Sequence, residues 1–406
     1  MFWIIHGHEI TILLKSTIFN SNDAADWLTR WWALFTFSSS VSVDTFFFLG
    51  GILLMYGFLN AKAKKIPFDI TVFYIHRYLR LTPAYAAVII LYMTFFIKLG
   101  TGPNWKTANQ GFQNECKEYW WSSLLYIQNF VNPENRCISQ TWYLSVDMQL
   151  YILSPLILIP IGKWPKITPY FFVVLVVLFT VIPTWVAWHF EIPALAMMAD
   201  IPNWHFIYYA QVHTRAGPWI IGLVMGYILF QTKHKKCRMN KIIVSLLWFL
   251  TAVVMLYIIF GNYPALDDNF HYSKLYNSLF IGLHRNLWAL GLSWIVFACI
   301  HGYGGPVNWI LSLSVFQFLA KITYCLYLIH KAIQYYNRGI VRVPIIFSNY
   351  TILKSFFSTT CLSILIAIIW VLCFEAPFVV IDGVITKAVL SLWKKATPKK
   401  ELKQET

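Results

Sequence analysis

Charged residues are scarce in this chain of 406 residues. Asp, Glu, Lys and Arg make up 12% of the sequence, whereas hydrophobic types make up 58%. Mean hydropathy is +0.58. Stretches 169–190 and 242–260 carry no Asp, Glu, Lys or Arg, over the roughly 20 residues that a helix needs to cross a bilayer. A soluble domain could not cover so much apolar surface with so few charges, so the composition predicts a membrane protein.

Acidic residues are scarcer still, with 17 Asp and Glu against 32 Lys and Arg, for a net charge of +15. On a soluble protein this excess would suggest a nucleic-acid partner. Here the cations gather in segments 61–80, 163–166, 233–241 and 394–403, and most acids lie in the segments between them. This alternation is typical of the positive-inside rule. We therefore expect membrane lipid, and no nucleic acid, as partner.

Cysteine is also sparse, and its seven copies are too scattered for a disulfide scaffold. The Cys and His residues show no spacing typical of a metal site, so we expect no metal. Cys116 and Cys137 share one segment that the charge pattern places outside the cytosol, where an oxidising compartment would allow them to pair. A disulfide there predicts Cα atoms within about 7 Å of each other.

The apolar stretches predict an all-α, polytopic protein with about ten transmembrane helices, because a spanning backbone must satisfy its own hydrogen bonds. We expect a membrane domain over 1–390, with a possibly truncated first span, and a disordered, basic cytosolic tail over 391–406. Both termini should be cytosolic. The expected spans are 1–18, 41–60, 71–98, 140–161, 169–190, 212–231, 242–261, 278–300, 316–337 and 352–381.

Ionisable residues inside these spans are costly and mark candidate functional sites. His8 follows Gly7 part-way along the first span. A neutral imidazole can accept a proton from a hydroxyl near neutral pH, which suits a general base. The alternative is a histidine that caps a short helix or bonds a neighbouring carbonyl. The residues alone leave both open.

Three carboxylates also fall in or near spans. Asp44 opens the second span and could be a helix N-cap or a functional group. Asp147 lies about two turns into the fourth span, where a carboxylate must find a partner or stay protonated. Glu375, near the cytosolic end of the last span, could simply extend towards water.

Four arginines could meet anions in the membrane. Arg77 and Arg80 are three residues apart on one helix face at the cytosolic mouth, and paired guanidinium groups suit phosphates. Positive-inside anchoring explains the same pair without a ligand. Arg215 and Arg285 lie towards the outer ends of their spans, where each could hold a carboxylate from another helix.

Short motifs in a fixed order resemble the acyltransferase-three family of integral membrane acyltransferases, and more closely its animal, nose-resistant-to-fluoxetine-like branch. These motifs are Gly7-His8, Val43-Asp44-Thr45-Phe46-Phe47, Arg77-x-x-Arg80-Leu81-Thr82-Pro83, Thr141-Trp142-Tyr143-Leu144-Ser145-Val146-Asp147, Arg215-Ala216-Gly217-Pro218, Gly302-Tyr303-Gly304-Gly305-Pro306, the segment Lys321-Ile322-Thr323-Tyr324-Cys325-Leu326-Tyr327-Leu328-Ile329-His330 and Glu375-Ala376-Pro377.

The resemblance implies about ten helices and transfer of an acyl group from a cytosolic donor, usually acyl-CoA, to a hydroxyl. It places His8 at the family's catalytic histidine and the Arg77–Arg80 pair at its Arg-x-x-Arg motif. Bacterial members usually carry glutamate where Asp147 stands. The family also often has an arginine eleven residues before its histidine, a position that precedes Met1, so we expect an upstream part to be missing or shortened.

The leading hypothesis is a multi-pass membrane O-acyltransferase of the plasma membrane or endoplasmic reticulum. Acyl-CoA would be the donor substrate, the two paired arginines would bind its phosphates, and a lipid or other small molecule would be the acceptor. His8 would be the general base. Asp44, Asp147 or Glu375 would orient His8 or hold arginines. The alternative is a non-enzymatic lipid or small-molecule transporter, in which the same buried polar residues line a path.

Overall fold

A computed structural model describes residues 1–195, 203, 205–267 and 273–396 of the chain. Within these residues the regular elements are helices, and the one β-type contact is an isolated bridge between Ile18 and Ile345. The predicted all-α fold is therefore confirmed.

The α-helices are α1 (Phe2–Leu14), α2 (Ser21–Leu28), α3 (Ala33–Phe37), α4 (Val41–Ala63), α5 (Ile70–Ile90), α6 (Trp105–Leu124), α7 (Gln128–Val131), α8 (Trp142–Leu153), α9 (Pro155–Lys163), α10 (Thr168–His189), α11 (Val212–Thr232), α12 (Lys241–Phe260), α13 (Lys274–Ile300), α14 (Gly305–Leu311), α15 (Ser314–Gly339), α16 (Asn349–Trp370) and α17 (Ala376–Ala396). Short 3-10 or π turns are η1 (Ser38–Ser40), η2 (Leu91–Phe95), η3 (Phe96–Lys98), η4 (Ser139–Thr141), η5 (His205–Tyr209), η6 (Tyr263–Leu266) and η7 (Val371–Glu375).

Seven helical stretches in the described residues are long and apolar enough to cross a membrane, or eight if the bent pair of α14 and α15 is one span. The chain is thus an integral, multi-pass membrane protein, but the expected count of about ten is not confirmed. One reason is α1, which has only 13 residues, too few to cross a bilayer of ordinary thickness.

Several helices begin and end close to the expected span boundaries. For example, the expected span 169–190 is helix α10, Thr168–His189. Helix α5 begins at Ile70 because the Asp69 carboxylate accepts hydrogen bonds from the backbone N–H groups of Thr71 and Val72, at 2.8 and 3.0 Å. Such a cap satisfies donors that the first helical turn leaves without partners.

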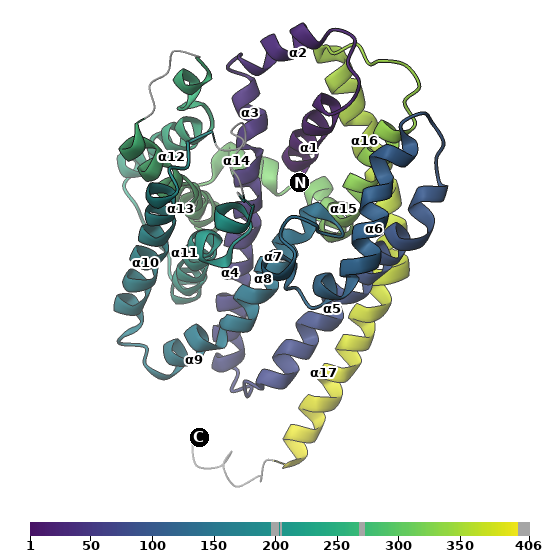
Figure 1. Cartoon of the computed structure of the whole chain (residues 1–406). Coiled ribbons are helices and arrows are strands. Elements are labelled where there is room, and N and C mark those ends of the chain that lie inside the picture. The colour runs from purple at the N-terminus through teal and green to yellow at the C-terminus, as the bar shows by residue number, and fades with distance from the viewer. Residues whose placement is uncertain (196–202, 204, 268–272, 397–406) are drawn as a thin grey trace, which may run out of the picture.

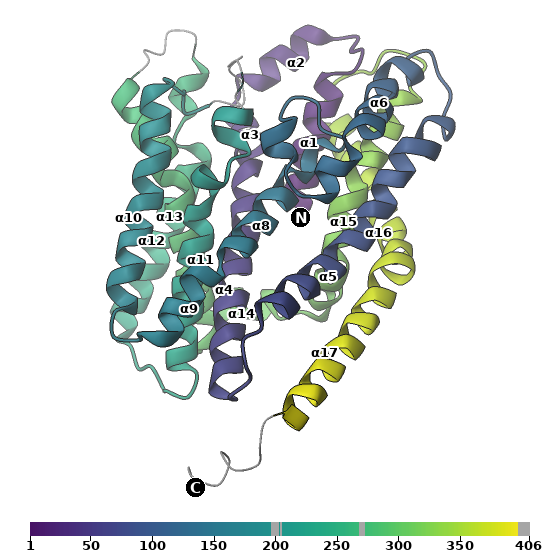
Figure 2. The same cartoon turned by 60° about the horizontal axis from the view of Figure 1, so that its bottom comes forward.

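The long helices form one bundle whose two ends differ (Figures 1 and 2). The turns after α4 and α9 lie at the end towards which α17 runs, whereas α2 and α6 lie at the opposite end. The basic turns after α4 and α9 therefore share one end, as the charge pattern predicts. Met1, by contrast, lies near the centre of the bundle in both views.

Helices α4 and α11 approach each other closely through glycines. A Cβ on Gly51 would collide with the backbone carbonyl of Trp219, and one on Gly222 would collide with that of Phe48. Only small residues allow such contact between membrane helices. This approach places the start of α4, with Asp44, directly beside α11, with Arg215.

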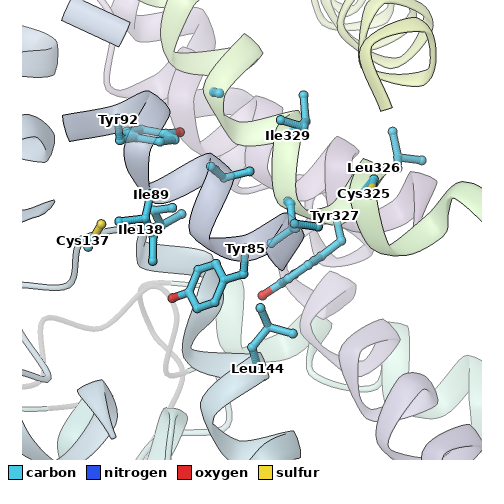
Figure 3. Close-up of a cluster of buried hydrophobic side chains, with 14 of the residues drawn as sticks. Tyr85, Ile89, Tyr92, Cys137, Ile138, Leu144, Cys325, Leu326, Tyr327 and Ile329 are labelled. Carbon is cyan, nitrogen blue, oxygen red and sulfur yellow. The ribbon is translucent and has the colours of Figure 1, made fainter. Parts of the chain in front are cut away.

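A second core joins α5, α8 and α15 (Figure 3). It contains buried tyrosines whose hydroxyls have partners: Tyr85 donates to the Thr141 hydroxyl at 2.8 Å, and Tyr327 donates to the Gln140 carbonyl. Buried tyrosines with satisfied hydroxyls hold helices in a defined register. This core fixes the segment of α15 that carries His330.

The C-terminal part differs in extent from the expectation. The last expected span was 352–381, but helix continues from Asn349 through η7 and α17 to Ala396, into the segment expected to be a disordered tail. The remainder of that tail, 397–406, lies outside the described residues.

Candidate active site

A cavity of about 930 Å³ is lined in part by residues around the turns after α4 and α9, at the end of the bundle that carries these basic turns. We call it the basic cavity. Its charged and imidazole-bearing lining consists of Lys62, His76, Arg77, Arg80, Asp147, Lys163 and Glu375. Its apolar lining includes Leu53, Leu54, Phe58, Ile159 and Trp219. A volume of this order suits a ligand of drug or cofactor size.

Arg77 and Arg80 both line the basic cavity, but their surroundings differ. Arg77 donates a hydrogen bond to the Asp147 carboxylate and lies over the Tyr151 ring, 5.0 Å from its centroid. Arg80 is exposed. Asp147 therefore holds Arg77, as one of the sequence hypotheses allowed, and Arg80 remains the arginine positioned to meet a ligand from solution.

Glu375 lies in the π-turn η7 and also lines the basic cavity. One of its oxygens accepts a hydrogen bond from the Cys325 thiol at 3.0 Å. At the same end, His76 approaches Asp382 at 3.0 Å, an α5–α17 contact that the sequence analysis did not propose. Together these contacts tie the last helices to the wall of the cavity.

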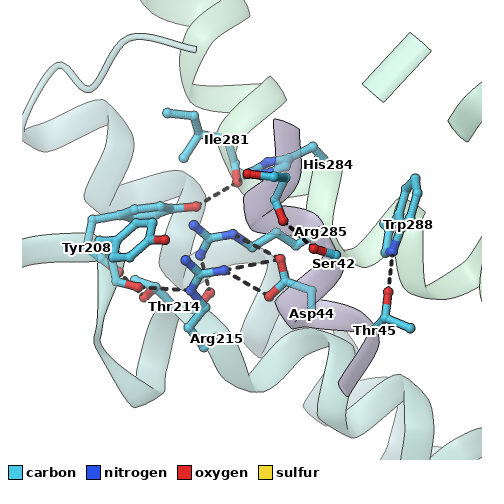
Figure 4. Close-up of polar contacts among 12 residues, drawn as sticks. Ser42, Asp44, Thr45, Tyr208, Thr214, Arg215, Ile281, His284, Arg285 and Trp288 are labelled. Atoms are coloured by element: carbon cyan, nitrogen blue, oxygen red, sulfur yellow. Dashed lines mark hydrogen bonds and ion pairs between the residues drawn. The ribbon is translucent and has the colours of Figure 1, made fainter. Parts of the chain in front are cut away.

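Asp44 belongs to a separate, buried ion cluster with Arg215 and Arg285 (Figure 4). The Arg215 guanidinium donates to both Asp44 oxygens at 3.0 and 3.2 Å, and Nε of Arg285 lies 3.7 Å from the carboxylate. Asp44 and Arg215 are both fully buried. Helix α4 starts at Val41 with Ser40 as its N-cap, so Asp44 pairs with arginine and is not the cap.

Aromatic faces and carbonyls complete the ion cluster. Arg215 stacks between Trp142 and Tyr209, at 4.7 and 4.8 Å from the ring centroids, and also donates to the Tyr209 carbonyl at 2.9 Å. Arg285 lies 4.5 Å from the Tyr208 ring centroid and donates to the Thr214 carbonyl at 3.1 Å. Ring faces and carbonyls stabilise the second positive charge that one carboxylate cannot neutralise.

His8 lies with neither of these groups. Its ring stacks on His330 of α15, with centroids 5.6 Å apart and planes at 26°. In the described part of the chain His8 forms no hydrogen bond to Asp44, Asp147 or Glu375. No contact in the structure therefore supports the hypothesis that one of these carboxylates orients His8. His6 points elsewhere, with Nε2 3.4 Å from the Thr36 hydroxyl.

His330 and Lys331 are site residues that the sequence analysis missed. Nδ1 of His330 lies 2.7 Å from the Tyr327 carbonyl. Because a carbonyl can only accept, Nδ1 carries the proton of the neutral ring, and Nε2 is an acceptor. That Nε2 is buried without a hydrogen-bond partner. Two adjacent ionisable residues inside the expected span 316–337 were the sequence signal that could have identified them as candidates.

Aromatic side chains separate the histidine pair from the basic cavity. Tyr327 lies 6.1 Å from the His330 ring and 5.7 Å from that of Tyr143, between ring centroids. Tyr143 in turn packs on Phe47. Tyr324 lines the cavity and precedes His330 by six residues, about 9 Å along the α15 axis. A ligand in the basic cavity would have to cross this short aromatic layer to reach the histidines.

The outer segment contains the predicted disulfide. Cys116 and Cys137 are bonded, with Cα atoms 4.0 Å apart, so this prediction is confirmed. The bond joins α6 to the segment before α8. Among the described residues, no group of His, Cys, Asp and Glu is arranged to hold a metal ion.

Comparison with known proteins gives a consistent result. The chain is 30% identical over 419 aligned residues to Nose resistant to fluoxetine protein 6 of Caenorhabditis elegans, covering 94% of this chain and 50% of that protein. It is 24% identical over 360 residues to Regulator of hypoxia-inducible factor 1 of the same organism, covering 84% and 68%. The chain thus spans about half the length of the first of these relatives.

No solved structure matches the chain significantly. The family profile described as "Acyltransferase domain" matches residues 1–374. This range includes His8, His330, the Arg77–Arg80 pair and the Arg215–Arg285 pair. The ordered motifs, the membrane fold and this match over most of the chain agree, and the chain belongs to the acyltransferase-three family.

Proposed function

We propose that this chain is a membrane O-acyltransferase that moves an acyl group from an acyl-CoA-type donor to a hydroxyl of a lipid or other small acceptor. Family membership supports acyl transfer in general and does not favour the alternative of a transporter. The donor, the acceptor and a location in the plasma membrane or endoplasmic reticulum are parts of the proposal.

The observation that carries the proposal is the mixed lining of the basic cavity. Lys62, Arg80 and Lys163 are exposed cations at its wall, and cations of this kind recognise phosphates. Leu53 and Phe58 belong to its apolar lining, which suits an acyl chain. A thioester of coenzyme A combines both chemistries in one molecule.

Arg77 would act as a positioning residue in this arrangement. Its guanidinium is engaged by Asp147 and packs on Tyr151, so it shapes the cavity wall and adds positive potential near the ligand. Arg80, one turn further along α5, would make the direct phosphate contact. This division of roles modifies the initial hypothesis, in which both arginines bind phosphate alike.

The proposed reaction is attack by the acceptor oxygen on the thioester carbonyl carbon. His8 accepts the hydroxyl proton as the new C–O bond forms. The C–S bond then breaks, and the departing thiolate takes the proton from His8 to give free coenzyme A. His330, stacked on His8, would hold the ring in place and offer its bare Nε2 to the same hydroxyl region.

The test of donor binding uses the full chain in lipid nanodiscs and measures coenzyme A affinity by isothermal titration. Lys62→Gln with Arg80→Gln should weaken binding by about tenfold or more, because charge-assisted hydrogen bonds are worth about 1.5–3 kcal/mol each. Arg77 stays in place, since its removal would leave Asp147 without its partner.

A matched control removes the same charge at the same end of the bundle. Lys235→Gln with Lys236→Gln changes two exposed lysines that do not line the basic cavity, and its affinity should equal that of the wild type. Equal losses in both double variants would reduce the effect to general electrostatics. Unchanged affinity in Lys62→Gln with Arg80→Gln would remove the donor site.

A further inference from the structure

A second charged cavity lies at the opposite end of the bundle. It measures about 340 Å³ and is lined by Lys15, Arg338 and Arg342 together with hydroxyl and amide groups such as Ser16, Thr107 and Asn104. We call it the outer cavity. None of the described residues that line it is acidic. Its chemistry is that of an oxyanion site, because nearly every polar group can donate a hydrogen bond.

A structural role accounts for only part of this cluster. Arg338 donates to the Lys15 carbonyl at 2.6 Å and so satisfies a group at the C-terminal end of α1, as cations commonly do. The side chains of Lys15 and Arg342 are exposed, and neither is needed for that cap. Positive-inside anchoring does not explain them either, because it favours the other end of the bundle.

A buried cation lies deeper along the same helix. The Lys331 side chain is buried, with 9% of the residue exposed, and it donates to the neutral Ser139 hydroxyl at 2.6 Å. Within the described residues it has no ion pair. Its ammonium also lies 5.6 Å from the centroid of the Tyr335 ring. Both of these partners are neutral, and a buried ammonium without a counter-ion is costly. Lys331 and Arg338 are seven residues apart on α15, which places them on one helix face.

The outer cavity and the histidine pair are carried by the same two helices. On α1, Lys15 follows His8 by seven residues, and on α15, Arg338 follows His330 by eight. These separations correspond to about 10 and 12 Å along the helix axes. His8 stacks on His330, and Arg338 contacts Lys15. The two helices thus carry the histidine pair and the outer cavity at a separation that a small molecule can span.

We propose that the outer cavity binds the phosphate of the acyl acceptor, and that Lys331 draws this phosphorylated alcohol inward until a hydroxyl reaches the histidine pair. This rests on the proposed function for the role of the hydroxyl, but the phosphate site itself does not. An inositol phosphate or sugar phosphate has the required span between hydroxyl and phosphate. The phosphate can belong to a lipid headgroup or to a soluble molecule.

Binding is measured with the full chain and without any acyl donor. The probes are inositol 1-phosphate in solution and phosphatidylinositol in nanodiscs, compared with free inositol and with diacylglycerol in nanodiscs, neither of which carries a phosphate. We expect both phosphate probes to bind better than their comparators, and the stronger of the two identifies the source. Lys15→Gln with Arg342→Gln should weaken phosphate binding about tenfold or more, with a smaller salt dependence.

Two further variants separate this site from a structural role. Arg30→Gln with Lys117→Gln removes two exposed cations from the same end outside the cavity and should bind like the wild type. Lys331→Met removes the buried charge and should also lose about tenfold in affinity while still folding. Equal affinity of Lys331→Met and wild type, or no preference for phosphate in any form, would overturn the proposal.

Failure of this site and failure of the catalytic proposal give different results. Phosphate binding that depends on Lys15, Lys331 and Arg342, in a protein without acyl-transfer activity, would retain the outer site and reject the reaction. Acyl transfer that depends on His8 but is insensitive to all three cations would retain the reaction and reject the outer site.

Discussion

Two aspartate–arginine pairs occupy contrasting surroundings in this protein. Asp147 and Arg77 lie at the wall of the basic cavity, where 26% of the arginine side chain is exposed. Asp44 and Arg215 are fully buried beneath Arg285 and aromatic rings. The chemistry of the two pairs is the same, but water and ligand can reach only one of them. The first can therefore change partners when a ligand binds, whereas the second can only hold helices together.

The histidine pair lies apart from both. If His8 is the general base, His8→Ala should lower the rate of acyl transfer by about 10²–10⁴-fold, the usual contribution of a positioned acid–base group. Donor affinity and thermal stability should change little, because the group acts mainly in the transition state. The measurement is release of coenzyme A by purified protein in lipid.

The control for this largest effect is His6→Ala, two residues away on α1 and directed to Thr36. It should keep most of the activity. Equal rates for His8→Ala and wild type would exclude His8 from the chemistry and would leave the accessible Asp147–Arg77 region as the better candidate.

The buried pair should dominate stability. Asp44→Asn leaves Arg215 and Arg285 without their shared carboxylate, and loss of one partner of a buried ion pair costs about 3–5 kcal/mol. We expect a marked loss of folded protein and a lower unfolding midpoint in detergent. Asp23→Asn, an exposed change in α2, is the matched control and should cost about 0.5 kcal/mol or less.

The contrast between the two pairs predicts a smaller loss of stability when the pair at the basic cavity is broken. Asp147→Asn frees Arg77, but water can solvate its partly exposed guanidinium, so the loss of stability should be about 1 kcal/mol. Affinity for coenzyme A should change at the same time, since the released arginine faces the ligand. A loss of stability as large as that of Asp44→Asn would break the distinction between the two pairs.

The last prediction tests which side of the membrane each region faces and involves no change in free energy. Single cysteines are placed at Lys236 and at Lys106, in a variant that lacks the other free cysteines but keeps Cys116 and Cys137. Both positions are exposed, whereas the nearby Asn109 is buried and unsuitable. An impermeant reagent added from outside should label position 106 and not position 236. Labelling of Lys236 from outside would place the basic cavity on the wrong side for a cytosolic donor.

Several features could be predicted because their causes are local. About 20 apolar residues in a row must form a helix in lipid, and the starts of α4, α10 and α12 agree with the expected spans to within one residue. The disulfide followed from two cysteines in one outer segment. The shortness of the first span was expected, and α1 has 13 residues. The extension of helix to Ala396 was not expected, because an apolar run shows that a helix forms but not how far it continues beyond the run.

The sequence by itself determined the membrane class, the approximate spans and the identity of the polar residues inside them, because hydropathy and charge act residue by residue. The tertiary structure alone decided the partners. Asp44 and Arg215 are 171 residues apart in the chain, and Arg77 and Asp147 are 70 apart. His8 meets His330 and none of the carboxylates proposed for it. A polar side chain in a span can pair with any helix packed beside it, and that neighbourhood is set by the contacts of the whole bundle.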